Sequence, residues 1–422
     1  MGESVTPDWK ECVAAALVAQ YDDVWVLHGA RTPFADYNGA FADISGTDLG
    51  IKAGRAAIAR AGIDGAAVDV TFAAQVAPSS FDALLYARHV GLYAGVPASR
   101  PALQVHRICC SGFETITQAA AGIAAGSFST ALCVGAENMT RHPIAAFSHR
   151  GGFRLGQVEF GDYLTEGSMD TAPGTNMGGT AENLAKLYAI SREEVDEFAG
   201  LSFARAVAAQ ASGALAEEIV PVVNESFELP RYATRKIRLP RDIDEVAQDT
   251  HIRPTSLDAL KKLRASFSGV QTGGNSSAIV DGGAAVIVTG GAGLRDATQQ
   301  PLGRVVAAAT VGVPPEIMGI GPVPAIMALL DATGLALADI DRIEINEAFA
   351  AQTLACVKDL GLDLARLNVN GGAIAFGHPL AATGVRATLS CLLELRRAGL
   401  RRGIVSACAG GGQGMALLLE AA

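Results

Sequence analysis

The sequence predicts an α/β protein made of two similar layered halves, with a further segment inserted between them. Three observations support this prediction. Short apolar runs alternate with longer helical patterns over residues 24–138, which is the order expected of parallel strands covered by helices. The same alternation returns over residues 302–407. Between them, residues 140–268 are richer in charge and less regular.

The first half begins with a strand at residues 24–27, where Val-Trp-Val-Leu ends in a loop of Gly, Arg, Thr and Pro. Helical and strand patterns follow, with a Pro-rich link before a short apolar run at residues 103–105. We expect Gly135 to end the last strand of this half, because glycine interrupts strand patterns. The expected helices lie at residues 48–61, 83–95 and 113–126, and the expected strands at residues 68–76 and 130–134.

The inserted segment contains one clear amphipathic helix, at residues 191–211. Ser191 is a suitable N-cap, and Glu193 and Glu194 follow in the first turn. Buried-strand character returns at residues 278–289.

The last third repeats the pattern of the first. Residues 106–139 and 368–414 each hold a polar, Gly-containing loop, a helix of small residues and a short strand that leads into glycine. This order and spacing indicate a duplication. The expected strands lie at residues 302–308, 340–345 and 404–407, and the expected helices at residues 322–332, 347–360 and 380–398.

These patterns divide the chain into four parts. The parts are an N-terminal extension (residues 1–22), a first half (residues 23–140 with 269–296), an inserted loop domain (residues 141–268) and a second half (residues 297–422).

Composition excludes several classes of protein. Half of the residues are hydrophobic and 18% are charged, so the chain can bury a large core. Lys and Arg number 33 against 43 Asp and Glu, and the net charge of −10 argues against a nucleic-acid binder. The seven Cys include no Cys-x-x-Cys pair and no zinc-ligand spacing with His, so we expect neither a disulfide framework nor a metal site.

The sequence shows no sign of a membrane anchor or a secretory signal. No apolar run reaches about 18 residues, the minimum for a transmembrane helix. The apolar stretch at residues 12–19 follows Glu3, Asp8, Lys10 and Glu11, which do not form a basic leader. We expect a short helix or a loose extension there, no membrane partner, and a cytoplasmic location.

Four short motifs lie on turns at strand ends, where open α/β sheets bind their ligands. In the first, Cys109 comes directly before an apolar helix, whose N-terminus would lower the pKa of a thiol and make it a nucleophile. The alternative is a buried structural Cys. In the second, at residues 370–379, glycines surround His378 and let the backbone approach a ligand. The alternative there is a turn with a hydrogen-bonded His.

The other two motifs lie later in the chain. At residues 406–414 a strand ends in Cys408 and three Gly follow, whose free N–H groups could form an oxyanion hole. The alternative is a Gly-rich turn with an incidental Cys. At residues 344–350 Asn346 stands at a strand-to-helix junction, where an N-cap is the simpler interpretation.

Together these motifs resemble those of the thiolases, the family of 3-ketoacyl-CoA thiolases and acetyl-CoA acetyltransferases. The similarity runs from about residue 24 to residue 420, and residues 272–277 and 317–322 add to it. The matching blocks are Cys-x-Ser-Gly at residues 109–112, Asn-Glu-Ala-Phe at residues 346–349, Gly-Gly-x-x-x-x-Gly-His-Pro at residues 371–379 and Cys-x-Gly-Gly-Gly-x-Gly at residues 408–414.

The resemblance implies a duplicated αβαβα layered fold, with a loop domain over the CoA site. It also implies homodimers or homotetramers. The implied reaction is the reversible CoA-dependent cleavage of a 3-oxoacyl-CoA to acetyl-CoA and an acyl-CoA, through an acyl-enzyme and ping-pong kinetics.

The resemblance also implies a role for each candidate residue. Cys109 would be acylated, and His378 would act as its general base. Cys408 would exchange a proton with the α-carbon of acetyl-CoA. Asn346 would hold a water in the oxyanion hole that includes His378, and the N–H groups of Cys109 and Gly410 would form the other oxyanion hole. This division is chemically reasonable, because thioester exchange needs a thiolate and C–C bond formation needs a second base.

By the same resemblance, CoA and acetyl-CoA are substrates and no permanent cofactor is expected. The implied CoA and pocket contacts are Arg253, Ser277, Met318 and Met177. Residues 231–264 form a basic stretch that could meet the phosphates of CoA or could be an ordinary solvated face.

Four positions depart from the usual thiolase pattern: His106, Cys110, Ala278 and Ala381. None removes a catalytic group. Asn176 weakens an assignment restricted to acetoacetyl-CoA, because members with that specificity often have His at this position. Residues 181–184, 190–194 and 318–322 are more similar to 3-ketoacyl-CoA thiolases of short and medium chain length. Two alternatives remain, a ketoacyl synthase-like condensing enzyme and a non-catalytic acyl-CoA- or lipid-binding relative.

Overall fold

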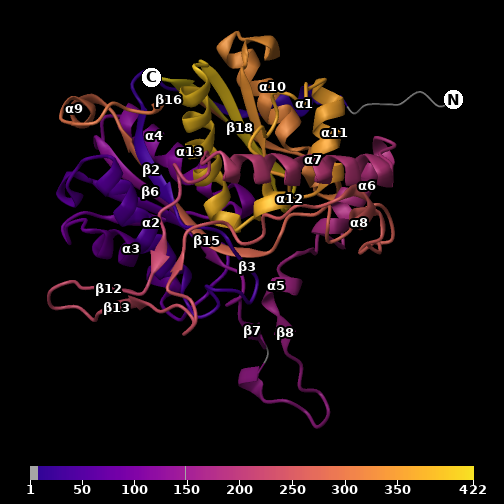
Figure 1. Ribbon diagram of the computed structural model, residues 1–422, viewed down its shortest axis with the longest axis horizontal. Coiled ribbons are helices and arrows are strands. Elements are labelled where there is room, and N and C mark those ends of the chain that lie inside the picture. The colour runs from indigo at the N-terminus through magenta and orange to yellow at the C-terminus, as the bar shows by residue number, and fades with distance from the viewer. Residues whose placement is uncertain (1–7, 148) are drawn as a thin grey trace.

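The computed structural model describes residues 8–147 and 149–422 and confirms the α/β prediction (Figure 1). Its main feature is an 11-stranded mixed sheet with the order β17-β18-β19-β16-β2-β15-β6-β4-β5, in which β1 also pairs with β16 and β3 with β15. Residues 1–7 of the predicted N-terminal extension lie outside the described residues.

The first half supplies one end of this sheet. Strand β15 pairs antiparallel with β2 and β6, and β4 pairs parallel with β6 and β5. The strands are β2 (Trp25–Arg31), β3 (Ala35–Asp36), β4 (Val70–Ala74), β5 (Ala102–Gln104), β6 (Thr130–Asn138) and β15 (Val280–Thr289).

The second half supplies the other end. Strand β19 lies between β16 and β18, and β17 pairs parallel with β18. Two residue pairs, Gly303 with Val26 and Arg304 with Trp25, join the two halves. The strands are β1 (Leu17–Gln20), β16 (Gly303–Gly312), β17 (Arg342–Ile345), β18 (Arg402–Ala409) and β19 (Gln413–Ala421).

Helices complete five layers around the two ends of the sheet. On β6, Leu132 and Val134 pack into the cluster that contains α2 and α3, whereas Cys133 packs on the opposite side with α4. Helices α4 and α13 lie against each other in the middle layer, and α10 covers β16 and β19. The layer helices are α2 (Gly46–Arg60), α3 (Tyr86–Ala94), α4 (Ser111–Ala124), α10 (Pro322–Thr333), α11 (Ala350–Leu360) and α13 (Leu380–Ala398).

Glycine allows the middle layer to pack closely. A Cβ at Gly112 would lie 2.7 Å from the backbone nitrogen of Val385, and a Cβ at Gly135 would overlap the carbonyl oxygen of Ala381. The predicted end of the strand at Gly135 is therefore wrong. Strand β6 continues to Asn138, and this glycine makes room for α13 instead of forming a turn.

The inserted region packs on both halves and also extends away from the body: its helices contact α11 and α12 of the second half, and its short strands add side chains to the core of the first half. The predicted helix is confirmed as α7, which begins with a capping box between Ser191 and Glu194. An arm that contains β7 and β8 projects at the bottom of Figure 1. The remaining helices here are α5 (Tyr163–Glu166), α6 (Met177–Leu187), α7 (Arg192–Ala211) and α8 (Leu257–Lys261). The short strands are β7 (Ile144–Ala145), β8 (Gly161–Asp162), β9 (Met169–Asp170), β10 (Thr175–Asn176), β11 (Val222–Val223), β12 (Glu225–Phe227), β13 (Arg235–Ile237) and β14 (Glu245–Val246).

Three further short α-helices of the described chain lie outside the layers, α1 (Lys10–Ala14), α9 (Gly291–Arg295) and α12 (Ala373–Phe376), and short 3-10 helices lie between the other elements. Within residues 8–147 and 149–422, none of the helices combines the length and the hydrophobicity that a membrane crossing requires.

Candidate active site

Cys109 lies on a short 3-10 helix, η3 (Ile108–Cys110), directly before α4. Ile108 has a φ of 48°, a conformation that β-branched residues rarely adopt, so the chain turns sharply at this point. Burial raises the pKa of the Cys109 thiol to about 12, although the backbone N–H groups of Cys109 and Gly410 favour the thiolate. The expected lowering of this pKa by the helix is therefore wrong, because desolvation outweighs it.

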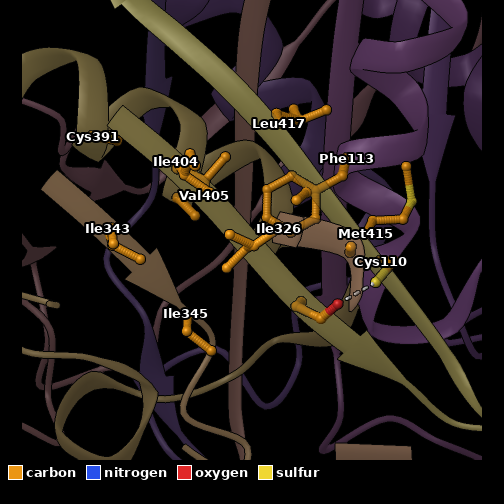
Figure 2. Packing of buried hydrophobic residues seen from close by; sticks show 14 of the residues in the cluster. Cys110, Phe113, Ile326, Ile343, Ile345, Cys391, Ile404, Val405, Met415 and Leu417 are labelled. Carbon is orange, nitrogen blue, oxygen red and sulfur yellow. Dashed lines mark hydrogen bonds between the residues drawn. The ribbon is translucent and has the colours of Figure 1, made fainter. Parts of the chain in front are cut away.

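Cys110 points away from the site and into the core. It is fully buried, and its Sγ donates a hydrogen bond to the carbonyl oxygen of Ala407 over 3.3 Å. Figure 2 shows this contact beside Phe113 and Met415. The departure at Cys110 thus changes the packing of the core, and its thiol is already engaged by a backbone carbonyl.

His378 is fixed at both its backbone and its ring. Its N–H donates to the carbonyl oxygen of Ala278 over 3.0 Å, and its Nδ1 lies 2.6 Å from Oγ1 of Thr383 on the first turn of α13. Burial lowers the pKa of His378 to about 3, with a further contribution from Arg386. The imidazole is therefore neutral at pH 7 and able to accept a proton.

Asn346 faces the other ring nitrogen of His378. Its Nδ2 lies 3.4 Å from Nε2 of His378, and its N–H donates to Ser406 on β18. Since Nδ2 can only donate, the consistent tautomer carries its proton on Nδ1, which donates to Thr383. Asn346 does not cap α11, which begins at Ala350, so the N-cap interpretation is wrong.

The Oδ1 atom of Asn346 is buried and has no hydrogen-bond partner among the residues that the structure describes. A buried amide oxygen is costly unless it accepts a hydrogen bond. Asn346 therefore offers an acceptor beside the His378 ring for a water or a substrate group.

Cys408 is fully buried near the end of β18 and packs in a small cluster with Met318 and Ala348. Met177 and Phe349 border this cluster. Burial raises the pKa of Cys408 well above its usual range, and the nearby sulfur of Cys109 adds to the effect. Two thiols from different halves of the chain thus meet at one place.

Gly410 lies in the turn between β18 and β19. A Cβ built there would lie 3.4 Å from Sδ of Met177 and 3.7 Å from Cγ2 of Ile108. Its backbone therefore passes next to the turn that carries Cys109, and its N–H is available to the Cys109 sulfur.

The four implied CoA contacts fall into two groups. Arg253 lines a cavity of about 580 Å³, whereas Met177 and Met318 lie beside Cys408. The other cavity residues are Phe203, Pro254, Thr255, Ser256, Ala259, Leu260, Leu263 and Gly274.

Ser277 connects the cavity to the cysteines. Its N–H donates to the carbonyl oxygen of Ala348, which packs on Cys408. Gly274 at the cavity is three residues from Ser277, so these two residues are at most about 11 Å apart along the chain. A cavity joined in this way to a cluster that contains Cys408 suits a long ligand that has a polar end and a reactive end.

The basic stretch at residues 231–264 does not form one patch. Arg235 is held in the first half by ion pairs with Asp48 at 2.7 Å and Asp82 at 2.6 Å. Arg253 instead lies over the ring of Phe203, with 5.5 Å between its Cζ and the ring centre, and faces the cavity. Of these two arginines, Arg253 is the one placed to meet an anionic ligand in the cavity.

Sequence reasoning missed two supporting residues. Thr383 fixes the tautomer of His378, and no local pattern marks it. Glu347 is a fully buried carboxylate that accepts hydrogen bonds from Ser202 at 2.7 Å, Asn368 at 2.9 Å and the N–H of Ile374 at 3.2 Å. Its position next to Asn346 in the Asn-Glu-Ala-Phe block was a signal that it supports the same site.

Comparison with known proteins identifies the family. Residues 24–291 match the model of the thiolase N-terminal domain, and residues 299–421 match that of the thiolase C-terminal domain. The chain therefore belongs to the thiolase family, and it has the thiolase fold.

Relatives and solved structures agree with this assignment. The mitochondrial 3-ketoacyl-CoA thiolase of Bos taurus is 41% identical, and the acetyl-CoA acetyltransferase of Rhizobium meliloti (strain 1021) is 39% identical; both alignments cover 94% of this chain and 98% of the relative. The crystal structure of human mitochondrial 3-ketoacyl-CoA thiolase in complex with CoA superposes with a TM-score of 0.89 and 38% identity, over 95% of this chain and 98% of that one. The Bacillus anthracis acetyl-CoA acetyltransferase gives a TM-score of 0.88 with 35% identity, over 96% and 100% of the chains.

Proposed function

We propose that the chain is a thiolase that cleaves a 3-oxoacyl-CoA with CoA to give acetyl-CoA and an acyl-CoA, and that it also catalyses the reverse condensation. As a thiolase it is an acyltransferase. The observation that supports this proposal most strongly is the hydrogen-bonded series Asn346–His378–Thr383, in a fold that also brings β18 with Cys408 against the turn that carries Cys109.

The first half-reaction would break the C–C bond. His378 takes the proton of the Cys109 thiol, and the sulfur attacks the 3-oxo carbon. The bond between C2 and C3 then breaks, the acyl group stays on Cys109 as a thioester, and acetyl-CoA leaves as an enolate. Cys408 gives its proton to C2 of this enolate. The protonated ring of His378 and a water held by Asn346 stabilise the enolate oxygen, which carries the charge that develops in this step.

The second half-reaction would transfer the acyl group to CoA. The CoA thiol gives its proton to the Cys408 thiolate that the first half-reaction left, and its sulfur attacks the thioester carbon of acyl-Cys109. The N–H groups of Cys109 and Gly410 stabilise the tetrahedral oxyanion, and the acyl-CoA leaves as Cys109 takes its proton back from His378. A covalent intermediate between two substrates implies ping-pong kinetics.

CoA would bind with its polar end at the cavity lined by Arg253 and its thiol near Cys408. Ser277 lies along the path between them, and Met177 and Met318 border the acyl group. No permanent cofactor enters these steps.

A short- or medium-chain 3-ketoacyl-CoA thiolase is the favoured specificity. Asn176, which weakens an acetoacetyl-only assignment, uses its side chain to cap α6 through the N–H of Gly179 at 2.8 Å. An acetyl-CoA acetyltransferase is the second candidate, because relatives of similar identity carry that name.

We further propose that the chain works as a homodimer or homotetramer. Strand β5 ends the sheet, and Leu103 on it is half exposed. Phe81 and Leu84 in the same half of the chain are also exposed. An open sheet edge with apolar side chains is a surface that proteins normally cover. Light scattering at several concentrations would measure the assembly.

The cytoplasmic location stays a prediction, since relatives named as mitochondrial are among the matches.

The test of the reaction is the loss of 3-oxoacyl-CoA on addition of CoA, over a chain-length series that begins at acetoacetyl-CoA. We expect thiolysis by the wild type, a loss of at least about 1,000-fold in Cys109→Ser, and near-normal rates in the control Cys110→Ser. A wild type that is inert on every chain length would overturn the proposal. It would favour a non-catalytic acyl-CoA- or lipid-binding relative, or a ketoacyl synthase-like enzyme if an acyl-carrier substrate is consumed.

A further inference from the structure

Glu344 and Arg386 form a buried ion pair with each other. Nη1 of Arg386 donates to Oε2 of Glu344 over 2.8 Å, and the side chains are 6% and 11% exposed respectively. In the described part of the chain neither residue has a second ion-pair partner. Each charge therefore depends on the other.

Neighbouring carboxylates have partners of their own. Glu218 pairs with Arg31 at 2.6 Å, and Glu394 pairs with Arg342 at 3.2 Å. Because these two carboxylates have their own arginines, Glu344 is the carboxylate that pairs with Arg386. Burying a charge is costly unless it is paired, so a pair held this way must be matched by a structural or functional gain.

The pair lies directly behind the two residues that face each other in the site. Glu344 is on β17, which ends at Ile345, directly before Asn346. Arg386 lies over the ring of Phe376, with 4.8 Å between its Cζ and the ring centre, and Phe376 is two residues before His378.

Helix α13 joins these contacts. Thr383, one turn before Arg386, holds Nδ1 of His378. One face of the helix thus fixes the ring of His378, the loop that leads to it and the strand that leads to Asn346. Movement of β17 relative to α13 would change the 3.4 Å distance between Asn346 and His378.

The charges do not form a binding site. The cavity beside them is only about 10 Å³ and is bordered by Glu218, Glu344, Phe376 and Arg386. A space of this size holds about one water molecule and no larger ligand.

We propose that the Glu344–Arg386 ion pair is a positioning element that sets the separation of Asn346 and His378. Neither residue touches the substrate. The inference rests on the proposed thiolase function, in which His378 and a water held by Asn346 stabilise the enolate oxygen. The C–C cleavage step then depends on the pair more strongly than the transfer of an acyl group between CoA and Cys109, which forms no enolate.

The test compares two rates in one protein. The first is the thiolysis of acetoacetyl-CoA, and the second is the exchange of labelled CoA into acetyl-CoA, which needs only acylation and deacylation of Cys109. Burial raises the pKa of Glu344 to about 7 against the opposing effect of Arg386, so both rates are measured at about pH 8, where the carboxylate is charged.

For Glu344→Gln we expect the rate of thiolysis to fall about 30- to 100-fold, because a small misplacement of reacting groups costs up to about 100-fold in rate. The rate of exchange should fall at most about 3-fold, and the KM for CoA should stay within about 2-fold of the wild type. Arg386→Lys, which keeps the charge but loses the planar fork, should give a smaller loss of thiolysis. Glu394→Gln is the matched control. It removes a carboxylate of α13 that pairs with Arg342 and Arg397 instead of Arg386. Both rates of this variant should stay within about 3-fold of the wild type.

The rates of thiolysis and of CoA exchange also show which outcomes would overturn the positioning role. Equal losses of thiolysis and exchange in Glu344→Gln would mean that folded enzyme is lost, and would overturn the positioning role. Unchanged thiolysis would overturn it as well. If Glu344→Gln does not fold, Arg386→Lys carries the same comparison. A wild type without thiolysis would instead overturn the proposed function.

Discussion

Oγ1 of Thr383 lies 2.6 Å from Nδ1 of His378, so the protein itself occupies one ring nitrogen and leaves Nε2 for Asn346 and the substrate. The sequence gives no hint of this contact, yet it determines which nitrogen can act as a base. The geometry of the site is therefore set as much by the first turn of α13 as by the motif that carries His378.

Thr383→Val should lower kcat for thiolysis about 10- to 100-fold, because the Nδ1–H loses its acceptor and the ring can turn or change tautomer. The matched control is Thr388→Val on the same helix, where the hydroxyl donates only to the carbonyl oxygen of Gly384 at 2.9 Å. Steady-state kinetics of both variants check this prediction. Equal activity in the two variants would show that Thr383 does not orient His378.

The resting enzyme should hold a neutral thiol beside a neutral imidazole. Burial raises the pKa of Cys109 to about 12 and lowers that of His378 to about 3, so between pH 6 and 9 the thiolate fraction rises about tenfold per pH unit. Inactivation by iodoacetamide should follow this slope without a plateau, and Cys109→Ser should not be labelled at the active site. A plateau with an inflection between pH 6 and 8 would indicate a preformed thiolate–imidazolium pair instead.

Arg253→Ala should raise the KM for CoA about 10-fold while kcat changes less than about 2-fold, because it removes a cation from the cavity far from the reacting atoms. Arg241→Ala is the control, since Arg241 is an exposed residue of the same basic stretch that does not line the cavity. The difference in KM for CoA between Arg253→Ala and the wild type should become smaller at high salt, because salt screens the charge of Arg253. A fall in kcat alone would place Arg253 outside the CoA site.

Gly412→Ala should destabilise the fold more than Gly410→Ala does. Gly412 has a φ of 80°, and a Cβ there would overlap the carbonyl oxygen of Val313. At Gly410 the nearest atom would be Sδ of Met177 at 3.4 Å, an ordinary contact. We expect the midpoint of thermal unfolding to fall by at least about 5 °C in Gly412→Ala and by less than about 2 °C in Gly410→Ala. Similar midpoints in the two variants would contradict the steric argument.

Local patterns predicted the layered fold and many of its elements. The helix expected at residues 380–398 is α13 with the same limits, because its N-terminal Pro379 and C-terminal Gly399 mark both ends. Strand β1 and strand β19 were not expected. Strand β19 contains Leu417, Leu418 and Leu419 in succession, a run that does not distinguish a buried strand from a helix.

The site was predictable where a motif carries the chemistry. Asn346 and His378 belong to separate blocks, and the structure brings them within 3.4 Å of each other. The Glu344–Arg386 pair was not predictable, because its residues are 42 positions apart and become partners only when α13 packs on β17. The pKa of Cys109 was predicted in the wrong direction, since burial depends on the whole fold.

The close contact of α4 with α13 has a consequence for synthesis on the ribosome. Helix α4 is complete at Ala124, whereas its partner in the middle layer begins only at Leu380. During translation, the apolar face formed by Phe113 and Ile116 must therefore wait for most of the chain to emerge before it is covered. A nascent chain of this protein is a natural client for a chaperone that binds exposed apolar helices, and neither half is expected to mature before the other is present.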